Sequence, residues 1–453
     1  MRILGKLYLR PPISFNNKTT LNIRQSLLSL KNLKVNSVTW LLIVQGLAIL
    51  LFFGIGYFEL KPDLIKKSGY AVFASDSFAC HEQAKIMCAF LEEGEFEKWY
   101  SIQSRFHTRV ASFCYLTFGK VFGMNISALW PINGLFLCLS WLFWKRIVCQ
   151  LGGVEPKHSF FWLMFPVLII HYTQLLRDPF YITFFLMWLN GWLNFFKCRE
   201  DKSLFKYVLL LLILCPLLYW SRHRFWVLAQ CISIACLFLS TYLWAIKKKT
   251  RFFMVVISIL VLAINSYSIV KTVKRYIGVP VKSEMVDGEL INKPFVFFYK
   301  IAFLRKKFTK SYQQNSSLDP HVEFNSDLDV VKYVPRALQI SFFMPFPNMW
   351  LSSDGKTGRV GKLVSAWEMI LMFIVFFLII KNFSKVKKNS LLMILCLTVL
   401  IYFIALGLVV TNGGALYRMR LCSWLLIGAI AHSSIFRDFS QDNHVKLEES
   451  NED

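Results

Sequence analysis

Charged residues are scarce in this chain. Only 17% of its 453 residues are Asp, Glu, Lys or Arg, whereas soluble domains carry about 25%. Hydrophobic residues make up 55% of the chain, and its mean hydropathy is +0.47. The apolar residues form blocks of the length that a bilayer requires. This composition excludes a soluble enzyme, a disordered protein and a secreted disulfide scaffold.

Several motifs of known chemistry are also missing. The 11 cysteines include no CxxC pair and no Cys/His cluster with the spacing of a zinc site. The sequence has no Walker loop, no dinucleotide-binding GxGxxG and no HExxH. Cys80 and Cys88 share one loop; in a helix they would lie about 12 Å apart along the axis, too far for a disulfide.

The apolar blocks predict an all-α polytopic integral membrane protein with about ten transmembrane helices. The expected spans are 38–59, 127–148, 159–175, 179–196, 205–220, 225–246, 252–270, 364–381, 390–411 and 418–434. A further half-buried helix is expected at 110–123.

The distribution of basic residues predicts the orientation. The net charge is +25. The loops after the second, fourth, sixth and eighth spans hold three or four Lys or Arg each, and the opposite short loops hold one or two. The positive-inside rule places both termini in the cytoplasm. The membrane in which we expect the chain is the plasma (inner) membrane. The basic residues are therefore expected to contact membrane lipids rather than nucleic acid.

This topology divides the chain into three parts. Residues 1–37 form a basic cytoplasmic arm, for which a mitochondrial transit peptide is the alternative interpretation. Residues 38–434 form a multi-span membrane domain with two long external loops, at 60–126 and 271–363. Residues 435–453 form a polar cytoplasmic tail.

Unusual polar residues gather on the external side, where an ionisable group near the membrane is a functional candidate. In the first external loop, Asp76, His81 and Glu82 lie in a stretch that predicts an amphipathic helix running to about Phe90. Asp76 is either the N-cap of that helix or a catalytic carboxylate that acts as a general base.

Two short breaks between spans carry arginines. In Arg177-Asp178-Pro179, Asp178 is expected as an N-cap and Pro179 at the first helical position. Arg177 either pairs with Asp178 or contacts a ligand. The run Arg222-His223-Arg224 either binds a phosphate or anchors the helix at the interface.

The C-terminal part holds further candidates. Arg336 precedes a Pro- and aromatic-rich stretch and either contacts a ligand, with Glu368 as its partner, or belongs to an interfacial turn. Tyr417 and Arg418 follow two glycines. Arg418 and Arg420 are two residues apart and should point to different sides of a helix. The cluster Arg305-Lys306-Lys307 is expected to be exposed or to contact lipid headgroups.

These motifs resemble the bacterial GT-C membrane glycosyltransferases, in particular the mannosyltransferase and aminoarabinose-transferase branches. The resemblance is carried by Asp76, Ala84, Gly94 to Trp99 and Phe106-His107 in the first external loop. Arg177-Asp178, Pro345-Phe-Pro347 and the segment from Asn412 to Arg420 also resemble these proteins, and Arg177-Asp178 resembles surface-polysaccharide polymerases as well.

The resemblance implies sugar transfer from a polyprenyl-phosphate donor to a lipid-linked glycan or another envelope acceptor, with Asp76 as the catalytic base. The residues expected to bind substrate are Arg177, Arg222, His223, Arg224, Arg336, Arg418, Tyr417, His81 and Glu82. The family often has two adjacent acidic residues where Ser77 follows Asp76, so no cofactor is expected and a divalent metal has no support.

Three other functions are compatible with the same sequence. A polymerase of surface-polysaccharide repeat units would use external arginines without an essential carboxylate. A transporter of lipid-linked glycans would show pseudo-symmetric halves and charges at mid-membrane. A structural membrane subunit would need none of these polar residues.

Overall fold

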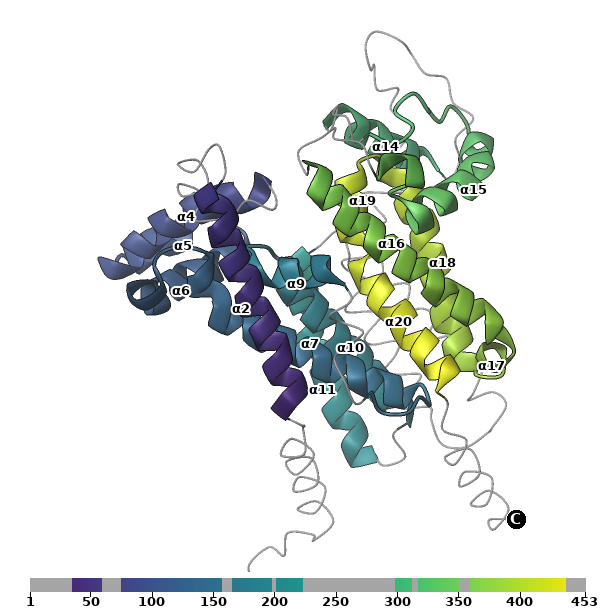
Figure 1. The fold of residues 1–453 in the computed structure, drawn as a ribbon, viewed down its shortest axis with the longest axis horizontal. Helices are drawn as coiled ribbons and strands as arrows, with labels where there is room; N and C mark the ends of the chain where they lie inside the picture. Colours follow the sequence, from purple (N-terminus) through teal and green to yellow (C-terminus); the bar gives the residue numbers. More distant parts are fainter. Residues whose placement is uncertain are drawn as a thin grey trace, which may run out of the picture.

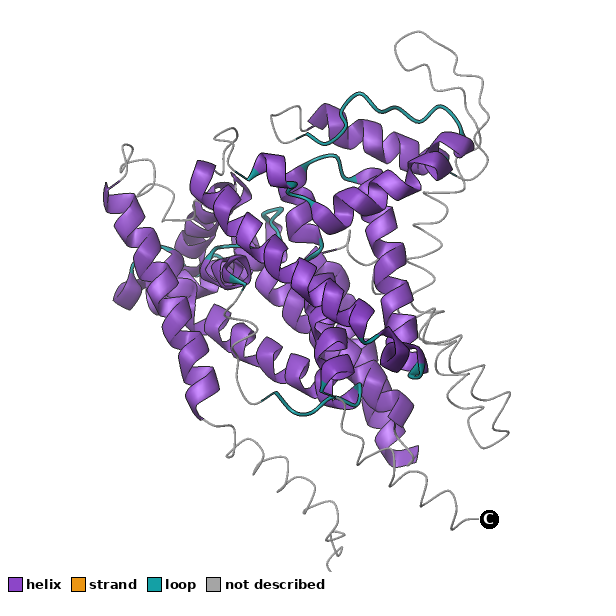
Figure 2. Cartoon of the chain, turned by 45° about the vertical axis from the view of Figure 1, so that its right-hand side comes forward, coloured by secondary structure: helices purple, strands orange, loops and turns teal. Residues whose placement is uncertain are grey.

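Helices account for most of the backbone that the structure describes. The computed structural model describes residues 35–58, 75–156, 165–197, 201–222, 298–311, 317–350 and 358–436. Within these ranges the chain forms helices and loops and no β-strand (Figure 2). The expectation of an all-α fold is thus confirmed for the described residues.

The helices follow one another in this order: α2 (Val35–Phe58), α4 (Ser75–Glu92), α5 (Phe96–Ser101), α6 (Phe106–Phe122), η1 (Ile126–Leu129), α7 (Trp130–Gln150), α9 (Pro166–Thr173), α10 (Asp178–Lys197), α11 (Asp201–Arg222), α14 (Tyr299–Ser311), α15 (Asp327–Phe343), η3 (Pro347–Met349), α16 (Gly358–Lys381), α17 (Phe383–Lys387), α18 (Ser390–Val409), α19 (Gly413–Met419) and α20 (Leu421–Ile435).

Within the described ranges, three helical stretches are long and apolar enough to cross a membrane: Ile126–Gln150, Leu363–Lys381 and Leu391–Val409. Shorter apolar helices cover Val38–Leu51, Leu209–Leu218 and Leu421–Ile435. These stretches coincide with spans that the apolar blocks predict, and they make the protein a candidate for membrane association.

Other expected spans need correction or lie outside the described residues. The block 159–175 contains only the eight-residue helix α9 within the described part of the chain, about 12 Å long at 1.5 Å per residue. The block 418–434 is divided, because α19 ends at Met419 and α20 begins at Leu421. The blocks 225–246 and 252–270 lie outside the described residues.

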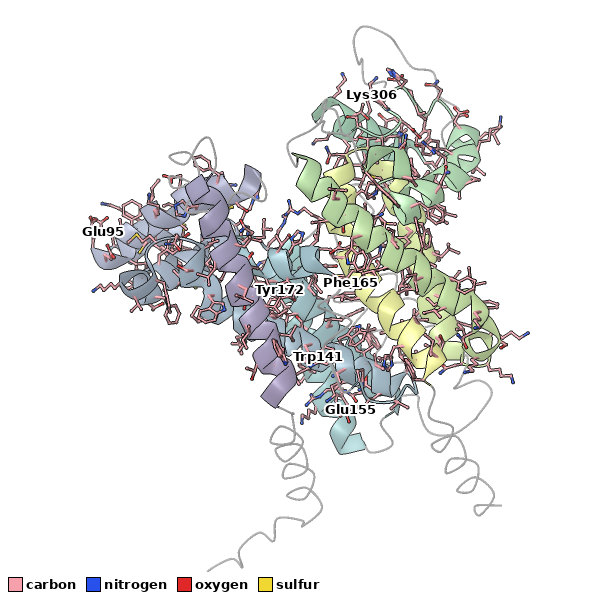
Figure 3. The ribbon with its side chains drawn as sticks, viewed as in Figure 1. Glu95, Trp141, Glu155, Phe165, Tyr172 and Lys306 are labelled. Atoms are coloured by element: carbon pink, nitrogen blue, oxygen red, sulfur yellow. The ribbon has the colours of Figure 1, made fainter. Side chains whose placement is uncertain are left out.

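The helices of the two expected external loops lie at the same end of the bundle. In Figure 1, α4, α5 and α6 lie at the upper end of one part, and α14 and α15 at the upper end of the other. The short helix α17 lies at the opposite end. In Figure 3 the labelled Glu95 and Lys306 lie toward the upper end and Glu155 toward the lower end.

One hydrophobic core joins the N-terminal and C-terminal helices. It includes Trp144 of α7 and Leu425 of α20, and the indole N–H of Trp144 donates to the carbonyl oxygen of Leu425 at 2.8 Å. Within the C-terminal helices, α15 and α18 are in close contact at Gly407, where a Cβ atom would overlap the backbone of Ala337. Only glycine allows this approach.

Candidate functional site

A group of polar side chains in direct contact lies where α9, α10 and α19 meet. α9 ends at Thr173, and α10 begins at Asp178 after a short break. The backbone N–H of Tyr181 donates to the carbonyl oxygen of Arg177 at 3.1 Å, so Asp178 and Pro179 occupy the first two helical positions. The expected N-cap is thus shifted by one residue, and the Asp178 carboxylate still stabilises the positive helix end.

Helix α19 approaches this break from the far end of the sequence. Its N-cap is Asn412, whose side chain accepts a hydrogen bond from the backbone N–H of Ala415 at 2.9 Å. Gly413 and Gly414 follow, and the helix ends after two turns at Met419. The cap and the short helix fix the position of Tyr417 and Arg418.

Arg418 and Asp178 form an ion pair across this junction. A terminal nitrogen of Arg418 (Nη2) donates to Oδ2 of Asp178 at 3.1 Å. The Asp178 side chain is 2% exposed and that of Arg418 is 19% exposed. The Nδ1 atom of His171, a buried residue of α9, lies 3.3 Å from the same carboxylate oxygen. The half-buried Arg177 is adjacent in sequence, so two arginines, one carboxylate and one imidazole lie in one neighbourhood.

The side chain of Arg420 points in a different direction from that of Arg418, as their spacing of two residues predicts. It is completely buried and donates to the carbonyl oxygens of Ser341 and Met344 at the end of α15. Its guanidinium lies 4.9 Å from the ring centre of Tyr417 and 4.3 Å from that of Trp424. Arg420 therefore connects α19 to α15.

Tyr417 is buried in the same junction. Its hydroxyl has no hydrogen-bond partner within the part of the chain that the structure describes. Its ring packs edge-on against Trp424 at 5.1 Å between centres.

A small pocket lies beside the break between α9 and α10. Polar side chains from three elements line it, namely His107 of α6, Asn133 of α7 and Gln174 of the break. All three residues are buried. Leu175 and Phe180 form part of its apolar wall.

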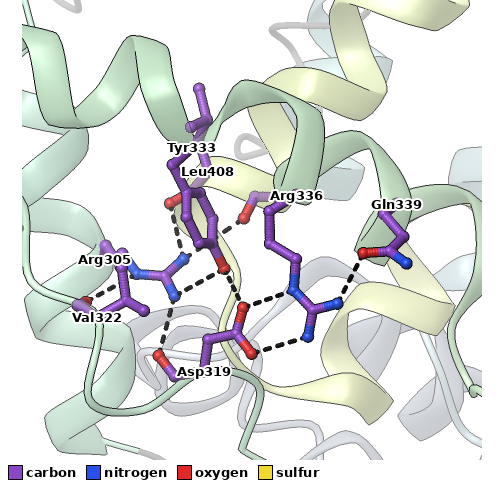
Figure 4. A network of polar contacts seen from close by, with 8 residues as sticks. Arg305, Asp319, Val322, Tyr333, Arg336, Gln339 and Leu408 are labelled. Carbon is purple, nitrogen blue, oxygen red and sulfur yellow. Dashed lines mark hydrogen bonds and ion pairs between the residues drawn. The ribbon is translucent and has the colours of Figure 1, made fainter.

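Arg336 lies in a different environment from the one expected. Its Nε and Nη2 donate to the two carboxylate oxygens of Asp319 at 2.9 and 3.0 Å, and its Nη1 donates to Gln339 at 2.7 Å (Figure 4). These N–H groups hold the pKa of the Asp319 carboxyl below its usual value. The expected partner Glu368 instead accepts a hydrogen bond from the backbone N–H of Val167 at 2.7 Å.

Arg305 is buried, contrary to the expectation of an exposed basic face. It is 2% exposed and donates to the carbonyl oxygens of Asp319 at 3.1 Å and Leu408 at 3.3 Å (Figure 4). It also donates to the hydroxyl of Tyr333 at 3.2 Å. Arg305 and Arg336 thus form one network that connects α14, α15 and the end of α18.

The candidates of the first external loop form a separate group. The Nδ1 atom of His81 lies 2.7 Å from the hydroxyl of Tyr115, and burial lowers the pKa of His81 to about 4. Glu82 is partly exposed and lies near Lys85. Asp76 is the second residue of α4 and therefore does not occupy the N-cap position that the sequence predicts for it. The structure does not describe its side chain.

The motif Arg222-His223-Arg224 lies mostly outside the described residues. Arg222 is the last residue of α11. Its side chain, His223 and Arg224 lie outside the described residues.

The sequence interpretation missed several residues of this junction. His171, Asn133 and Gln174 lie within or beside apolar blocks and form part of no recognised motif. A single His in a candidate span is itself a signal, because ionisable residues there are rare. Which partner it meets depends on packing between distant segments.

The described residues contain no group of three or more His, Cys, Asp or Glu side chains placed to hold a metal ion. Comparison with known proteins adds no relative: no protein-family model, no curated protein and no solved structure matches the chain.

Proposed function

We propose that the protein is an integral membrane glycosyltransferase that takes a sugar from a polyprenyl-phosphate donor. The acceptor is a lipid-linked glycan or another envelope molecule, and the reaction takes place at the outer face of the plasma membrane. The observation that carries the proposal is the Arg418–Asp178 pair beside Arg177, at the junction of α9, α10 and α19.

The charge of this junction suits a lipid phosphate. Arg418 and His171 both lie beside the Asp178 carboxylate, and Arg177, the residue before Asp178, brings a second arginine to the break. Arginine binds phosphate oxygens through paired N–H groups. When the sugar leaves, negative charge develops on the phosphate, and a fixed guanidinium stabilises that charge. Arg418 and Arg177 are the proposed phosphate contacts.

Asp76 is the proposed general base. It lies in the first turn of α4, and α4 and α19 are at the same end of the bundle (Figure 1). A carboxylate within reach of an acceptor hydroxyl would remove its proton as the new glycosidic bond forms. His81 and Glu82 follow on the same helix. Because His81 packs on Tyr115, we assign it to positioning α4.

The proposal includes a topology of about ten spans with both termini in the cytoplasm. It is supported by the common position of α4–α6 and α14–α15, opposite α17 (Figure 1). Lys385 and Lys387 belong to α17, which agrees with a cytoplasmic position for that end.

A repeat-unit polymerase is the second candidate. The observation that favours it is that Asp178, the carboxylate of this junction, is already paired with Arg418. A polymerase that binds a lipid diphosphate through arginines would need no additional carboxylate.

Deletion of the gene in its host distinguishes the two functions. Surface glycans of the deletion strain and its parent are compared by gel electrophoresis and mass spectrometry. Loss of one sugar or branch at unchanged chain length is the expected result. Collapse of long glycan chains to single repeat units would show that the protein is a polymerase and not a glycosyltransferase of the proposed kind. Unchanged glycans would contradict both.

A further inference from the structure

The described part of the chain contains two arginine–aspartate pairs, and they are built differently. In the Arg336–Asp319 pair, three guanidinium nitrogens have acceptors, two on Asp319 and one on Gln339. Such a two-pronged pair is a fixed structural contact. In the Arg418–Asp178 pair, one nitrogen meets one carboxylate oxygen. The Nε atom of Arg418 is buried and has no hydrogen-bond partner among the described residues.

Arg418 therefore retains unused capacity to bind an anion. A guanidinium group carries five N–H donors, and Arg418 makes one hydrogen bond, to Asp178, within the described part of the chain. Its side chain is 19% exposed, so a ligand can reach it, whereas that of Asp178 is 2% exposed.

Asp178 retains a polar neighbour if Arg418 turns away. The Nδ1 atom of His171 lies 3.3 Å from the oxygen that Arg418 contacts. A buried carboxylate that loses a charged partner is destabilised. The imidazole reduces that cost, because it is already within reach of the carboxylate.

We propose that the Asp178 carboxylate occupies the anion site of Arg418 while no substrate is bound, and that the phosphate of an incoming lipid displaces it. The inference rests on the proposed function, in which Arg418 holds a lipid phosphate, and it adds how that site is regulated. The ligand class is a phosphate monoester or diester, whose oxygens match the guanidinium donors. Asp178 lowers the affinity for the ligand, because the phosphate must first break the ion pair.

The test measures binding of three probes to the full-length protein in lipid nanodiscs: geranylgeranyl phosphate, inorganic phosphate and geranylgeraniol. Asp178→Asn removes the competing charge and should bind geranylgeranyl phosphate about three- to tenfold more tightly than the wild type, the range expected for a partly buried ion pair. Geranylgeraniol should bind both proteins equally. A gain for inorganic phosphate of the same size would show that the phosphate alone is recognised.

Asp319→Asn is the matched control, since it neutralises the other paired aspartate, and its phosphate affinity should equal that of the wild type. If Asp178→Asn does not fold, Asp178→Ser replaces it, because serine is tolerated at the start of a helix. Unchanged or weaker binding of geranylgeranyl phosphate by a folded neutral variant would overturn the inference, because Asp178 would then only position Arg418.

Transfer activity separates this inference from the proposed function. If Asp178→Asn binds geranylgeranyl phosphate more tightly but gene deletion leaves the surface glycans unchanged, the glycosyltransferase function is refuted. The displacement of Asp178 from Arg418 by phosphate then still stands. Loss of a sugar on deletion, together with unchanged binding by Asp178→Asn, would refute the exchange and keep the glycosyltransferase.

Discussion

Replacement of Arg305 by methionine should detach α14 and α15 from the end of α18. Methionine fills most of the space of the arginine stem but donates no hydrogen bond. The carbonyl oxygens of Asp319, Val322 and Leu408 would each lose the hydrogen bond from Arg305. The ring of Tyr333, 4.7 Å from the guanidinium, would lose its cation–π contact.

The expected loss of stability follows from these contacts. The hydrogen bonds from Arg305 to Asp319 and Val322 measure 3.1 and 3.2 Å, and that to Leu408 measures 3.3 Å. Removing a charged donor from a buried site costs about 1.5–3 kcal/mol per well-formed bond, and these bonds share one side chain. We therefore expect Arg305→Met to lower the free energy of unfolding by about 3–5 kcal/mol.

Thermal and chemical unfolding of the purified protein in detergent measures this loss, and hydrogen exchange locates it. Exchange should increase in peptides from α14 and α15 and stay unchanged in α7 and α10. Lys307→Met, an exposed position on the same helix, should change stability by less than about 0.5 kcal/mol. A loss below about 1 kcal/mol for Arg305→Met would refute the role of this arginine as the link between α14, α15 and α18.

Three further outcomes are expected. Burial holds the pKa of His81 at about 4, below its ordinary value of 6.5. The free energy of unfolding should therefore fall by up to about 3 kcal/mol as the pH drops from 6.5 to 4. His81→Gln should flatten this part of the stability–pH curve, and an unchanged slope would show that His81 is not the titrating group. Gly407→Ala should destabilise the protein by more than about 2 kcal/mol, because its Cβ meets the backbone of Ala337; wild-type unfolding would show that the two helices separate freely. Asp76→Asn should abolish sugar transfer while the protein stays in the membrane at its normal level, and full complementation of the deletion strain would remove Asp76 from the mechanism.

The helices were the most predictable part of the structure. Continuous apolar blocks predicted α2, α7, α10, α16 and α18 to within a few residues, except that α16 starts six residues earlier. Their length alone reflects the thickness of the bilayer. The bounds of α9 and the break at Arg420 were harder to predict from the sequence, because packing decides where a marginal helix ends.

The arginines show what a sequence pattern leaves open. The spacing of Arg418 and Arg420 correctly predicted different sides, which depends only on helix geometry. The burial of Arg305 was missed, because its acceptors at Leu408 lie about 100 positions away in the chain. Asp319 was likewise not recognised as the partner of Arg336, since both belong to a network formed by tertiary packing.

The central claim is that Arg418 holds a lipid phosphate in a sugar transfer, and complementation of the deletion strain tests it most directly. Arg418→Gln and Arg418→Lys are expressed in that strain, and the missing sugar is quantified by mass spectrometry. We expect no restoration by the neutral variant and a partial one by lysine, which keeps the charge but lacks the planar donor group. Full restoration by Arg418→Gln, at normal protein levels in the membrane, would contradict the account.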